Sequence, residues 1–458
     1  MRDRLSPLDA SFLHLERGNN HLHIGSALIF EGPAPALGEL CAAFEALFDR
    51  VPRYRQRVQQ VPLQLGRPVW VDDVEFDIRR HLRRTRLPPP GTDDALKSVA
   101  SRLMSRPLDL TRPPWETWFV EGLADGRWAL INKSHHAMVD GISGADITSL
   151  LLSPEPDVES PTPRPWSPTS QPSSAQLVGA ALVDTVRTAL VMGRAVVAAV
   201  HSPARALRRT AATLYGLAHA GAKAVHFEDG LNGPIGAGRR WEWARTDLAD
   251  IKMVKNAVGG TVNDVVVAAV AGGFRRYLIS RGEPVDGRSI RALVPVSTRA
   301  PDQRGQPGNE LSALLADLPV GIADPRERLA VVTGHLHNLK SGGMAIAVEG
   351  VLDAAEVVPG TIFAVAADLA ARLPQRSFST VTSNVPGPQL PMYLLARKVT
   401  GAFPFIPLGA DLRITIGVVS YDGKVNYGIT ADREAAPDVD VLRRGIEEST
   451  AEMVRLVG

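Results

Sequence analysis

Seven consecutive residues combine the groups that acid–base chemistry needs with a residue that permits a sharp turn. They are His135-His136-Ala137-Met138-Val139-Asp140-Gly141. The apolar residues 128–132 before them predict a strand, and the spacing of residues 142–151 after them predicts a helix. The pKa of a free imidazole is about 6.5, so a neutral histidine at this corner could take a proton from an alcohol at cytoplasmic pH.

Two simpler interpretations of the paired histidines remain open at this point. A histidine beside a strand can be a structural group, and paired histidines with an acidic residue can bind zinc. The sequence contains no His-Glu-x-x-His spacing, and its single cysteine, Cys41, cannot supply a cysteine-rich site. We therefore expect no metal.

The seven residues resemble the His-His-x-x-x-Asp-Gly signature of the CoA-dependent acyltransferase superfamily. Further segments narrow the resemblance to the bacterial wax ester synthase/diacylglycerol acyltransferase family, over nearly the whole chain. These segments are Pro7-Leu8-Asp9, Phe12-Leu13, His21-Leu22-His23-Ile24-Gly25, Arg112-Pro113-Pro114-Trp115-Glu116, Asn263-Asp264-Val265-Val266-Val267-Ala268, Val294-Pro295-Val296-Ser297, Gly308-Asn309 and Ser383-Asn384-Val385-Pro386-Gly387-Pro388. Pro114 and Val267 stand where the family pattern has leucine, and both exchanges are apolar.

The resemblance implies both a fold and an activity. The fold would be α/β, with two chloramphenicol-acetyltransferase-like lobes and the active site at their interface. The activity would be acyl-CoA-dependent O-acylation of diacylglycerol, with long-chain alcohols as a second class of acceptor, by direct transfer without a cofactor. The resemblance gives the general base role to His136 and a supporting role to His135, a choice that spacing alone could not make.

Two roles are possible for Asp140. A position four residues along a helical turn would bring its carboxylate near the imidazole of His136, where it could fix the tautomer and stabilise the charged ring. In the superfamily, the equivalent aspartate usually pairs with an arginine that holds the corner in shape. We favour this structural role, and Gly141 would permit the sharp turn.

Two further pairs of residues are candidates for substrate binding. Asn263 and Asp264 could orient a substrate near the lobe interface, although such a pair at the start of a helix is also an ordinary cap. Ser383 and Asn384 precede Pro386-Gly387-Pro388, a rigid loop that could place a donor beside the thioester oxygen as its negative charge develops. A plain turn would need no such function. Trp115 is expected in the core, and Cys41 is expected to be buried and inert.

The composition fits a large enzyme of a reducing compartment. The chain has 458 residues, 45% hydrophobic and 22% charged, which suits two domains of about 200 residues each. The net charge is +2 and no nucleic-acid-binding motif accompanies the arginines, so we expect no nucleic-acid partner. One cysteine permits no intrachain disulfide, and we find neither a signal-peptide core nor an apolar run long enough for a membrane span. We expect a cytoplasmic protein.

A change in composition divides the chain into three segments. Residues 153–174 are crowded with proline, serine and threonine, which predicts an exposed linker, and residues 175–224 have helical spacing. We therefore expect an N-terminal acyltransferase lobe over 1–152, a linker and amphipathic helical crossover over 153–239, and a C-terminal acyltransferase lobe over 240–458.

Local patterns predict further elements in both lobes. Helices are expected over 37–50, 93–105, 263–281, 326–340 and 439–456, strands over 290–294 and 378–382, and a hairpin from 412–421 and 424–430. Thr261 or Asn263 could cap the helix over 263–281, and Gly282 could end it. The pair Asp422-Gly423 suits a type I′ turn.

Water-insoluble acceptors would require contact with a lipid surface. The basic stripe of the helix over 175–224 is a candidate for peripheral contact with a membrane or lipid droplet. Its arginines are Arg187, Arg194, Arg205 and Arg208. The arginines of residues 79–86 could likewise meet CoA phosphates or anionic lipid heads, although a solvated face is the commoner explanation.

Two alternative functions remain beside lipid acylation. One is acylation of a secondary-metabolite alcohol or amine, as in peptide-synthetase condensation domains. The other is a non-catalytic lipid-binding protein of the same fold. The intact motif argues against the second alternative, because a pseudoenzyme has no chemical reason to keep its base.

Overall fold

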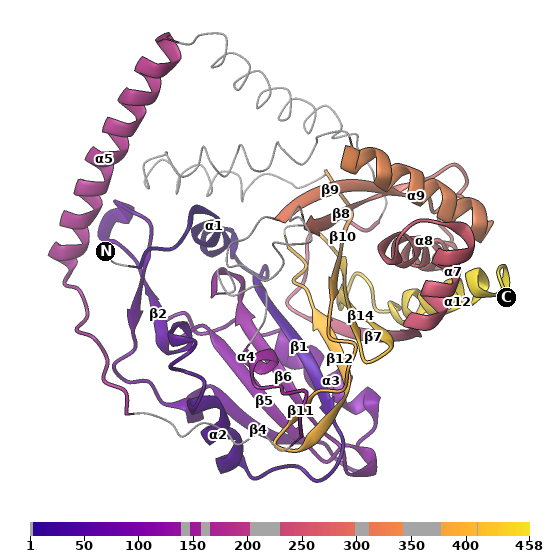
Figure 1. The fold of residues 1–458 in the computed structure, drawn as a ribbon, viewed down its shortest axis with the longest axis horizontal. Helices are drawn as coiled ribbons and strands as arrows, with labels where there is room; N and C mark the ends of the chain where they lie inside the picture. Colours follow the sequence, from indigo (N-terminus) through magenta and orange to yellow (C-terminus); the bar gives the residue numbers. More distant parts are fainter. Residues whose placement is uncertain are drawn as a thin grey trace.

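Two six-stranded sheets, one in each of two lobes, organise the molecule (Figure 1). The computed structural model describes residues 3–138, 147–156, 165–201, 230–297, 311–341, 377–409 and 411–458. The first sheet has the strand order β11-β12-β1-β6-β5-β4, and the second has the order β7-β14-β13-β10-β8-β9. The strands β2 and β3 form a small separate sheet. This arrangement confirms the expected mixed α/β fold with two lobes.

The bounds of the elements are as follows. The first sheet contains β1 (His23–Phe30), β4 (Leu82–Arg86), β5 (Trp115–Glu121), β6 (Trp128–His135), β11 (Tyr393–Leu394) and β12 (Arg397–Phe405). The second contains β7 (Arg239–Asp247), β8 (Ile290–Ser297), β9 (Leu311–Leu318), β10 (Thr380–Pro386), β13 (Ile414–Tyr421) and β14 (Lys424–Asp432), and the small sheet contains β2 (Gln56–Gln59) and β3 (Val69–Asp72). The helices are α1 (Pro7–Leu15), α2 (Leu37–Glu45), α3 (Asp93–Met104), α4 (Ile147–Leu150), α5 (Ser174–His201), α7 (Leu248–Val258), α8 (Val262–Ser280), α9 (Pro325–Ser341) and α12 (Asp440–Arg455). The short 3₁₀ turns used below are η2 (Pro62–Gln64), η3 (Ile78–Arg80) and η5 (His136–Met138).

One strand from the C-terminal part of the sequence belongs to the sheet of the first lobe. β12 belongs to the C-terminal part of the sequence, but it pairs antiparallel with β1 in the first sheet. Beside it, the rings of Phe403 and Trp243 stack with centroids 4.6 Å apart, and Lys97 of α3 lies 3.0 Å from the carboxylate of Glu242. The segment over 240–458 therefore supplies strands to both lobes, and apolar packing joins the lobes along this seam.

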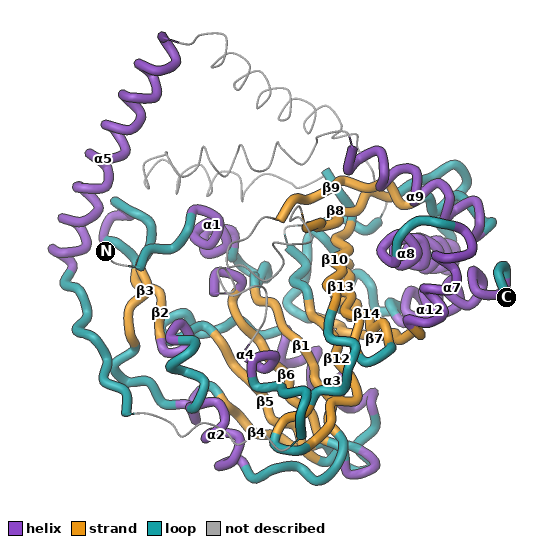
Figure 2. The backbone as a smooth tube through the Cα atoms, viewed as in Figure 1, coloured by secondary structure: helices purple, strands orange, loops and turns teal. Residues whose placement is uncertain are grey.

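Four helices, α7, α8, α9 and α12, lie together on one side of the second sheet (Figure 2). The central one, α8, is apolar nearly all round, and residues 264–274 are buried. It approaches α12 very closely, because a Cβ on Gly273 would lie only 2.6 Å from Cγ1 of Ile446. A Cβ there would also lie 3.1 Å from the backbone N of Ile446, so a larger residue would force the two helices apart in this densely packed core.

Most of the predicted elements are confirmed, with boundaries shifted by a few residues. The hairpin is present, and Asp422 (φ 44°) and Gly423 (φ 76°) both have the positive φ that a type I′ turn requires. Of the two predicted caps of α8, Thr261 is the one that caps it, and Gly282 follows the end of the helix with φ 72°. The helix expected over 37–50 is shorter than predicted, because α2 ends at Glu45 and turns follow.

The crossover helix is described only in its first part. α5 extends from the first lobe (Figure 1), and its first turns bury Leu177 and Ala181 against Val61, Val69 and Val71. The rest of the predicted helix lies outside the described residues. Within the described ranges, no single helix has the length and apolar composition of a membrane span, and α7 and α8 meet that test only as a pair bent by 103°.

Candidate active site

The two histidines lie where the central strand β6 ends. His135 is the last residue of β6 and pairs with His23 of β1, and His136 begins the turn η5. The backbone N–H of His135 donates to the carbonyl of Pro114 (2.9 Å), and that of His136 donates to the carbonyl of Leu22 (2.8 Å). Backbone from both sides therefore holds this corner, as its predicted place at the end of a strand suggested.

Both ring nitrogens of His135 are engaged inside the protein. The ring is fully buried, and its Nδ1 accepts a hydrogen bond from the backbone N–H of Ala137 (3.1 Å). Because an accepting nitrogen has no hydrogen, the proton of the neutral ring is on Nε2, which donates to Oε2 of Glu16 (2.6 Å). His135 therefore has a fixed tautomer and orientation.

Glu16 was not among the residues predicted from the sequence. It lies just after α1, 119 positions before its histidine partner. Burial raises the pKa of its carboxyl, but hydrogen bonds from His135 and His21 outweigh this effect and lower the pKa to about 2. Its nearness to the His21-Leu22-His23 segment was the only signal in the sequence, because nothing local indicates a partner so far along the chain.

The charge of Glu16 should stabilise the fold in a pH-dependent way. Because folding lowers its pKa from 4.5 to about 2, the stabilisation is complete above pH 4.5 and is lost as the pH falls through 2. Glu16→Gln keeps an acceptor oxygen without the charge. In urea unfolding, the wild type should exceed this variant in free energy of unfolding by a constant amount above pH 4.5, and by progressively less below it.

The exposed Glu31 provides a matched control, since Glu31→Gln removes the same charge from the surface. A difference between wild type and Glu16→Gln that does not change with pH would contradict stabilisation by the charged carboxylate of Glu16.

His136 is less buried than its neighbour. Its ring packs against Phe12 of α1, with centroids 4.0 Å apart and planes inclined by 32°. The contact explains why a segment near the N-terminus accompanies the histidine motif, because α1 covers the corner. The other two motif residues singled out by sequence, Asp140 and Gly141, lie outside the described residues, and both roles of Asp140 stay predictions.

A buried lysine fixes the strand that ends in this corner. Lys133 of β6 donates to the carbonyls of Leu103 (3.2 Å) and Arg106, at the end of α3. Burial lowers its pKa to about 8. His23 binds the carbonyl of Met104 in the same region (3.0 Å), so two polar side chains tie the end of α3 to the central strands.

In the second lobe, the two asparagines predicted to bind substrate lie in contact. Nδ2 of Asn384 on β10 donates to Oδ1 of Asn263 on α8 (3.1 Å), across 121 residues of sequence. Asp264 instead caps the helix, because Oδ2 accepts from the N–H of Thr261 (2.8 Å) and the Thr261 hydroxyl accepts in return (3.2 Å). Ser383 is half-buried on β10, opposite Gly417 of β13.

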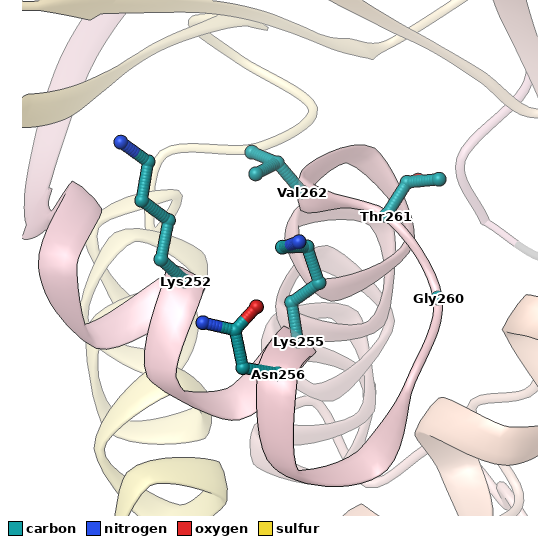
Figure 3. A pocket seen from close by; sticks show the side chains of 6 residues that line it. All are labelled: Lys252, Lys255, Asn256, Gly260, Thr261 and Val262. Atoms are coloured by element: carbon teal, nitrogen blue, oxygen red, sulfur yellow. The ribbon is translucent and has the colours of Figure 1, made fainter.

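A cavity of about 430 Å³ opens between α7 and the start of α8. Lys252, Lys255 and Asn256 of α7 stand across from Thr261 and Val262 at the start of α8 (Figure 3). Among the described residues, neither lysine forms an ion pair. The two ammonium groups favour a ligand with negative charge.

Trp115 and Cys41 were expected to be structural. Trp115 is buried, and its Nε1 donates to the carbonyl of Tyr54 (2.8 Å), which confirms the expectation. Cys41 is only half-buried, so the expectation that it is buried was wrong, because the outer face of α2 forms the wall of an open groove described below. Burial raises the pKa of its thiol, which disfavours the reactive thiolate.

The chain matches two family models. The model of the wax ester synthase/diacylglycerol acyltransferase catalytic domain covers residues 5–266, and that of the WS/DGAT C-terminal domain covers residues 307–454.

Similar proteins are known from sequence and from structure. A probable diacylglycerol O-acyltransferase of Mycobacterium tuberculosis is 36% identical over 456 residues, which cover 99% of this chain and 96% of the relative. A second one from that organism is 33% identical over 467 residues, covering all of both chains. The wax ester synthase/diacylglycerol acyltransferase of Marinobacter aquaeolei has a similar structure (TM-score 0.69, 26% identity, 99% and 100% coverage). The first condensation domain of the CDA synthetase shares the fold (TM-score 0.56, 17% identity, 100% and 97% coverage).

Proposed function

Because the chain belongs to the wax ester synthase/diacylglycerol acyltransferase family and is an acyltransferase of that type, we propose that it esterifies diacylglycerol with acyl-CoA and that His136 is the general base. Long-chain alcohols are a second class of acceptor on this proposal. The observation that supports the assignment of the base is the locked ring of His135, whose two nitrogens bind Ala137 and Glu16. His135 therefore cannot take the proton of the acceptor, and the role of base falls to His136, as the resemblance to the family implies.

The proposed reaction needs no acyl-enzyme. His136 takes the proton of the acceptor hydroxyl while that oxygen attacks the thioester carbonyl, and a tetrahedral intermediate with an oxyanion forms. Its collapse breaks the carbon–sulfur bond, and the CoA thiolate takes the proton from the imidazolium. Ester and free CoA result, and the histidine is neutral again.

The asparagine pair is suited to bind a developing negative charge. An amide NH₂ has two hydrogens, and the bond between Asn384 and Asn263 uses one of them. The second N–H of Asn384 is a candidate donor to the thioester oxygen, where a preorganised donor contributes about 10²- to 10³-fold to turnover. In this proposal Ser383 is a neighbouring polar contact, and Asp264 acts only by capping α8.

The lysine-lined cavity is suited to the phosphates of acyl-CoA. CoA has three phosphate groups, and Lys252 and Lys255 provide two cations beside the start of α8, which is one residue from Asn263. The pantetheine arm could then lead from the phosphates toward the asparagine pair. Acyl-CoA is thus a substrate here and not a resident cofactor.

Purified protein with labelled palmitoyl-CoA tests the proposed function. Diacylglycerol, hexadecanol and a long-chain amine are offered in parallel, and labelled products are separated from free acid. Ester from diacylglycerol is the expected main product. Labelled amide alone would support the condensation-type alternative, and no product from any acceptor would support a non-catalytic lipid-binding protein.

The proposal includes peripheral contact of α5 with a lipid surface. Three apolar side chains on this helix are at least half exposed: Leu182 (54%), Val183 (51%) and Val186 (60%). Leu63 on η2, which contacts α5, is 87% exposed. Of the basic stripe predicted from sequence, Arg187 is exposed, and the side chains of the other three arginines lie outside the described residues.

Removing this apolar surface should weaken lipid binding without changing the chemistry. The triple variant Leu182→Ser, Val183→Ser, Val186→Ser is expected to bind neutral phosphatidylcholine vesicles at least about tenfold more weakly, since each side chain would bury apolar area in the interface. Turnover of a short water-soluble alcohol should not change. Vesicle sedimentation measures the first quantity.

Ile279→Ser with Val331→Ser is a control, because both residues are exposed and apolar but lie on the second lobe. Equal vesicle binding by wild type and the α5 triple variant would contradict the contact.

A further inference from the structure

A second basic cavity lies on the first lobe, far in sequence from the cavity lined by Lys252 and Lys255. It is an open groove of about 790 Å³ between α2 and the η3–β4 segment. Its polar wall consists of Arg79, Arg80, Arg83, Arg84 and Arg112. We call it the arginine groove.

The floor and opposite wall of the groove are largely apolar. Ile78 and Leu82 are buried beneath the arginines, and Leu37, Cys41 and Ala42 of α2 face them. A ligand that fills the groove would therefore meet guanidinium groups at one side and aliphatic surface at the other. This combination favours an amphiphile over a small inorganic ion.

The positive charge of the groove is only partly neutralised by the protein. Arg84 binds Glu121 (2.5 Å), and Arg112 lies 3.6 Å from Asp109.

The guanidinium groups of two other groove arginines form no ion pair among the described residues. Arg83 donates to the carbonyl of Arg80 (3.2 Å) and lies over the ring of Trp118 (5.5 Å), and neither contact neutralises its charge. Arg79 also faces the groove without an ion pair, and Glu45 is the single acidic residue among those that line it.

Protection of an edge strand is the simpler explanation for basic residues here. β4 is the last strand of the first sheet, and charged side chains on an edge prevent pairing with other chains. That explanation accounts for Arg83 and Arg84, which are in β4. It does not account for Arg79 and Arg112, which come from other segments and line the same cavity.

We propose that the arginine groove binds the phosphate head of an anionic phospholipid at a lipid surface. Guanidinium groups bind phosphate oxygens in pairs of parallel hydrogen bonds, and a phosphate monoester offers up to two negative charges to several of them at once. The first carbons of the lipid would lie on Leu37, Ile78 and Leu82. The site is separate from the residues proposed for acyl transfer, so its test does not depend on the transfer mechanism.

The test uses the double variant Arg79→Gln, Arg83→Gln, which removes the two guanidinium groups that form no ion pair among the described residues. Full-length wild type and variant are titrated with phosphatidylcholine vesicles that contain phosphatidic acid. The variant should bind about tenfold more weakly, and both proteins should bind pure phosphatidylcholine equally. Melting temperature and turnover of a water-soluble alcohol should stay at wild-type levels.

Two comparisons decide the assignment. Arg102→Gln with Arg455→Gln removes the same charge from exposed positions outside the groove, and it should leave vesicle binding nearly unchanged. An equal loss in both double variants would mean attraction by net charge and would overturn the site. Calorimetric binding of inorganic phosphate to the groove without any preference for phosphatidic acid vesicles would overturn the lipid assignment.

Discussion

Replacing His136 with alanine is expected to lower kcat by about 10²- to 10⁴-fold while the protein stays folded. The methyl group cannot accept the proton of the acceptor hydroxyl, so the attacking oxygen would have to carry a positive charge into the transition state. The ring is only half-buried and packs on Phe12, so its loss should disturb the core little. Initial rates with palmitoyl-CoA and diacylglycerol, together with a thermal melt, provide the measurement.

His135→Ala is the informative comparison, because it changes the neighbouring ring in a different environment. This substitution removes a fully buried ring and leaves the carboxylate of Glu16 without its hydrogen bond at 2.6 Å, which costs about 1–3 kcal/mol of stability. We expect a lower melting temperature and a smaller loss of turnover than in His136→Ala. Near-normal turnover of folded His136→Ala would rule out the proposed base.

The elements that could be predicted from sequence are those whose signals are local. The turn at Asp422-Gly423 needs two residues with positive φ, and the pair Asp-Gly is typical of such a turn. The helix α8 has a cap at Thr261 and a stop at Gly282, so both of its ends could be found within a few residues. Such signals depend only on neighbouring residues, so they can be recognised without knowledge of the fold.

Long-range pairing could not be predicted in the same way. The insertion of β12 between β11 and β1 depends on which strand edge is open after both lobes have formed, and alternating apolar residues in a strand do not identify its partner. The resemblance to a family implied two lobes but not this exchange.

The candidate site likewise combines residues that local motifs identify with partners that lie far away in the sequence. The residue types at His135, His136, Asn263 and Asn384 could be singled out from motifs, but their partners could not. The bond between the two asparagines spans 121 residues, and that between His135 and Glu16 spans 119. Glu16 in particular follows the short helix α1, and a glutamate in that position is usually exposed to solvent. Its burial and its lowered pKa arise only when α1 closes over the end of β6.

Replacing both lysines of the cavity at α7 should separate donor binding from chemistry. The double variant Lys252→Gln, Lys255→Gln is expected to raise KM for acyl-CoA by about a hundredfold, because two charge-assisted hydrogen bonds to phosphate contribute about 1.5 kcal/mol each. The kcat should change little, since the phosphates are bound equally in the ground state and the transition state. Steady-state kinetics at low ionic strength measure both constants, and added salt should narrow the difference by screening the exposed charges.

An acyl donor without phosphates tests whether Lys252 and Lys255 act on the phosphates. With an acyl-pantetheine thioester, which lacks the nucleotide and its phosphates, wild type and the lysine double variant should have the same kcat/KM. Arg443→Gln with Arg444→Gln on α12 removes equal charge from a helix surface that does not line the cavity, and it should leave KM for acyl-CoA nearly unchanged. An equal loss with both donors in the lysine variant would mean that Lys252 and Lys255 support the fold around Asn263 and do not bind phosphate. A selective loss with acyl-CoA instead requires the phosphates of the donor to lie against Lys252 and Lys255, between α7 and the start of α8.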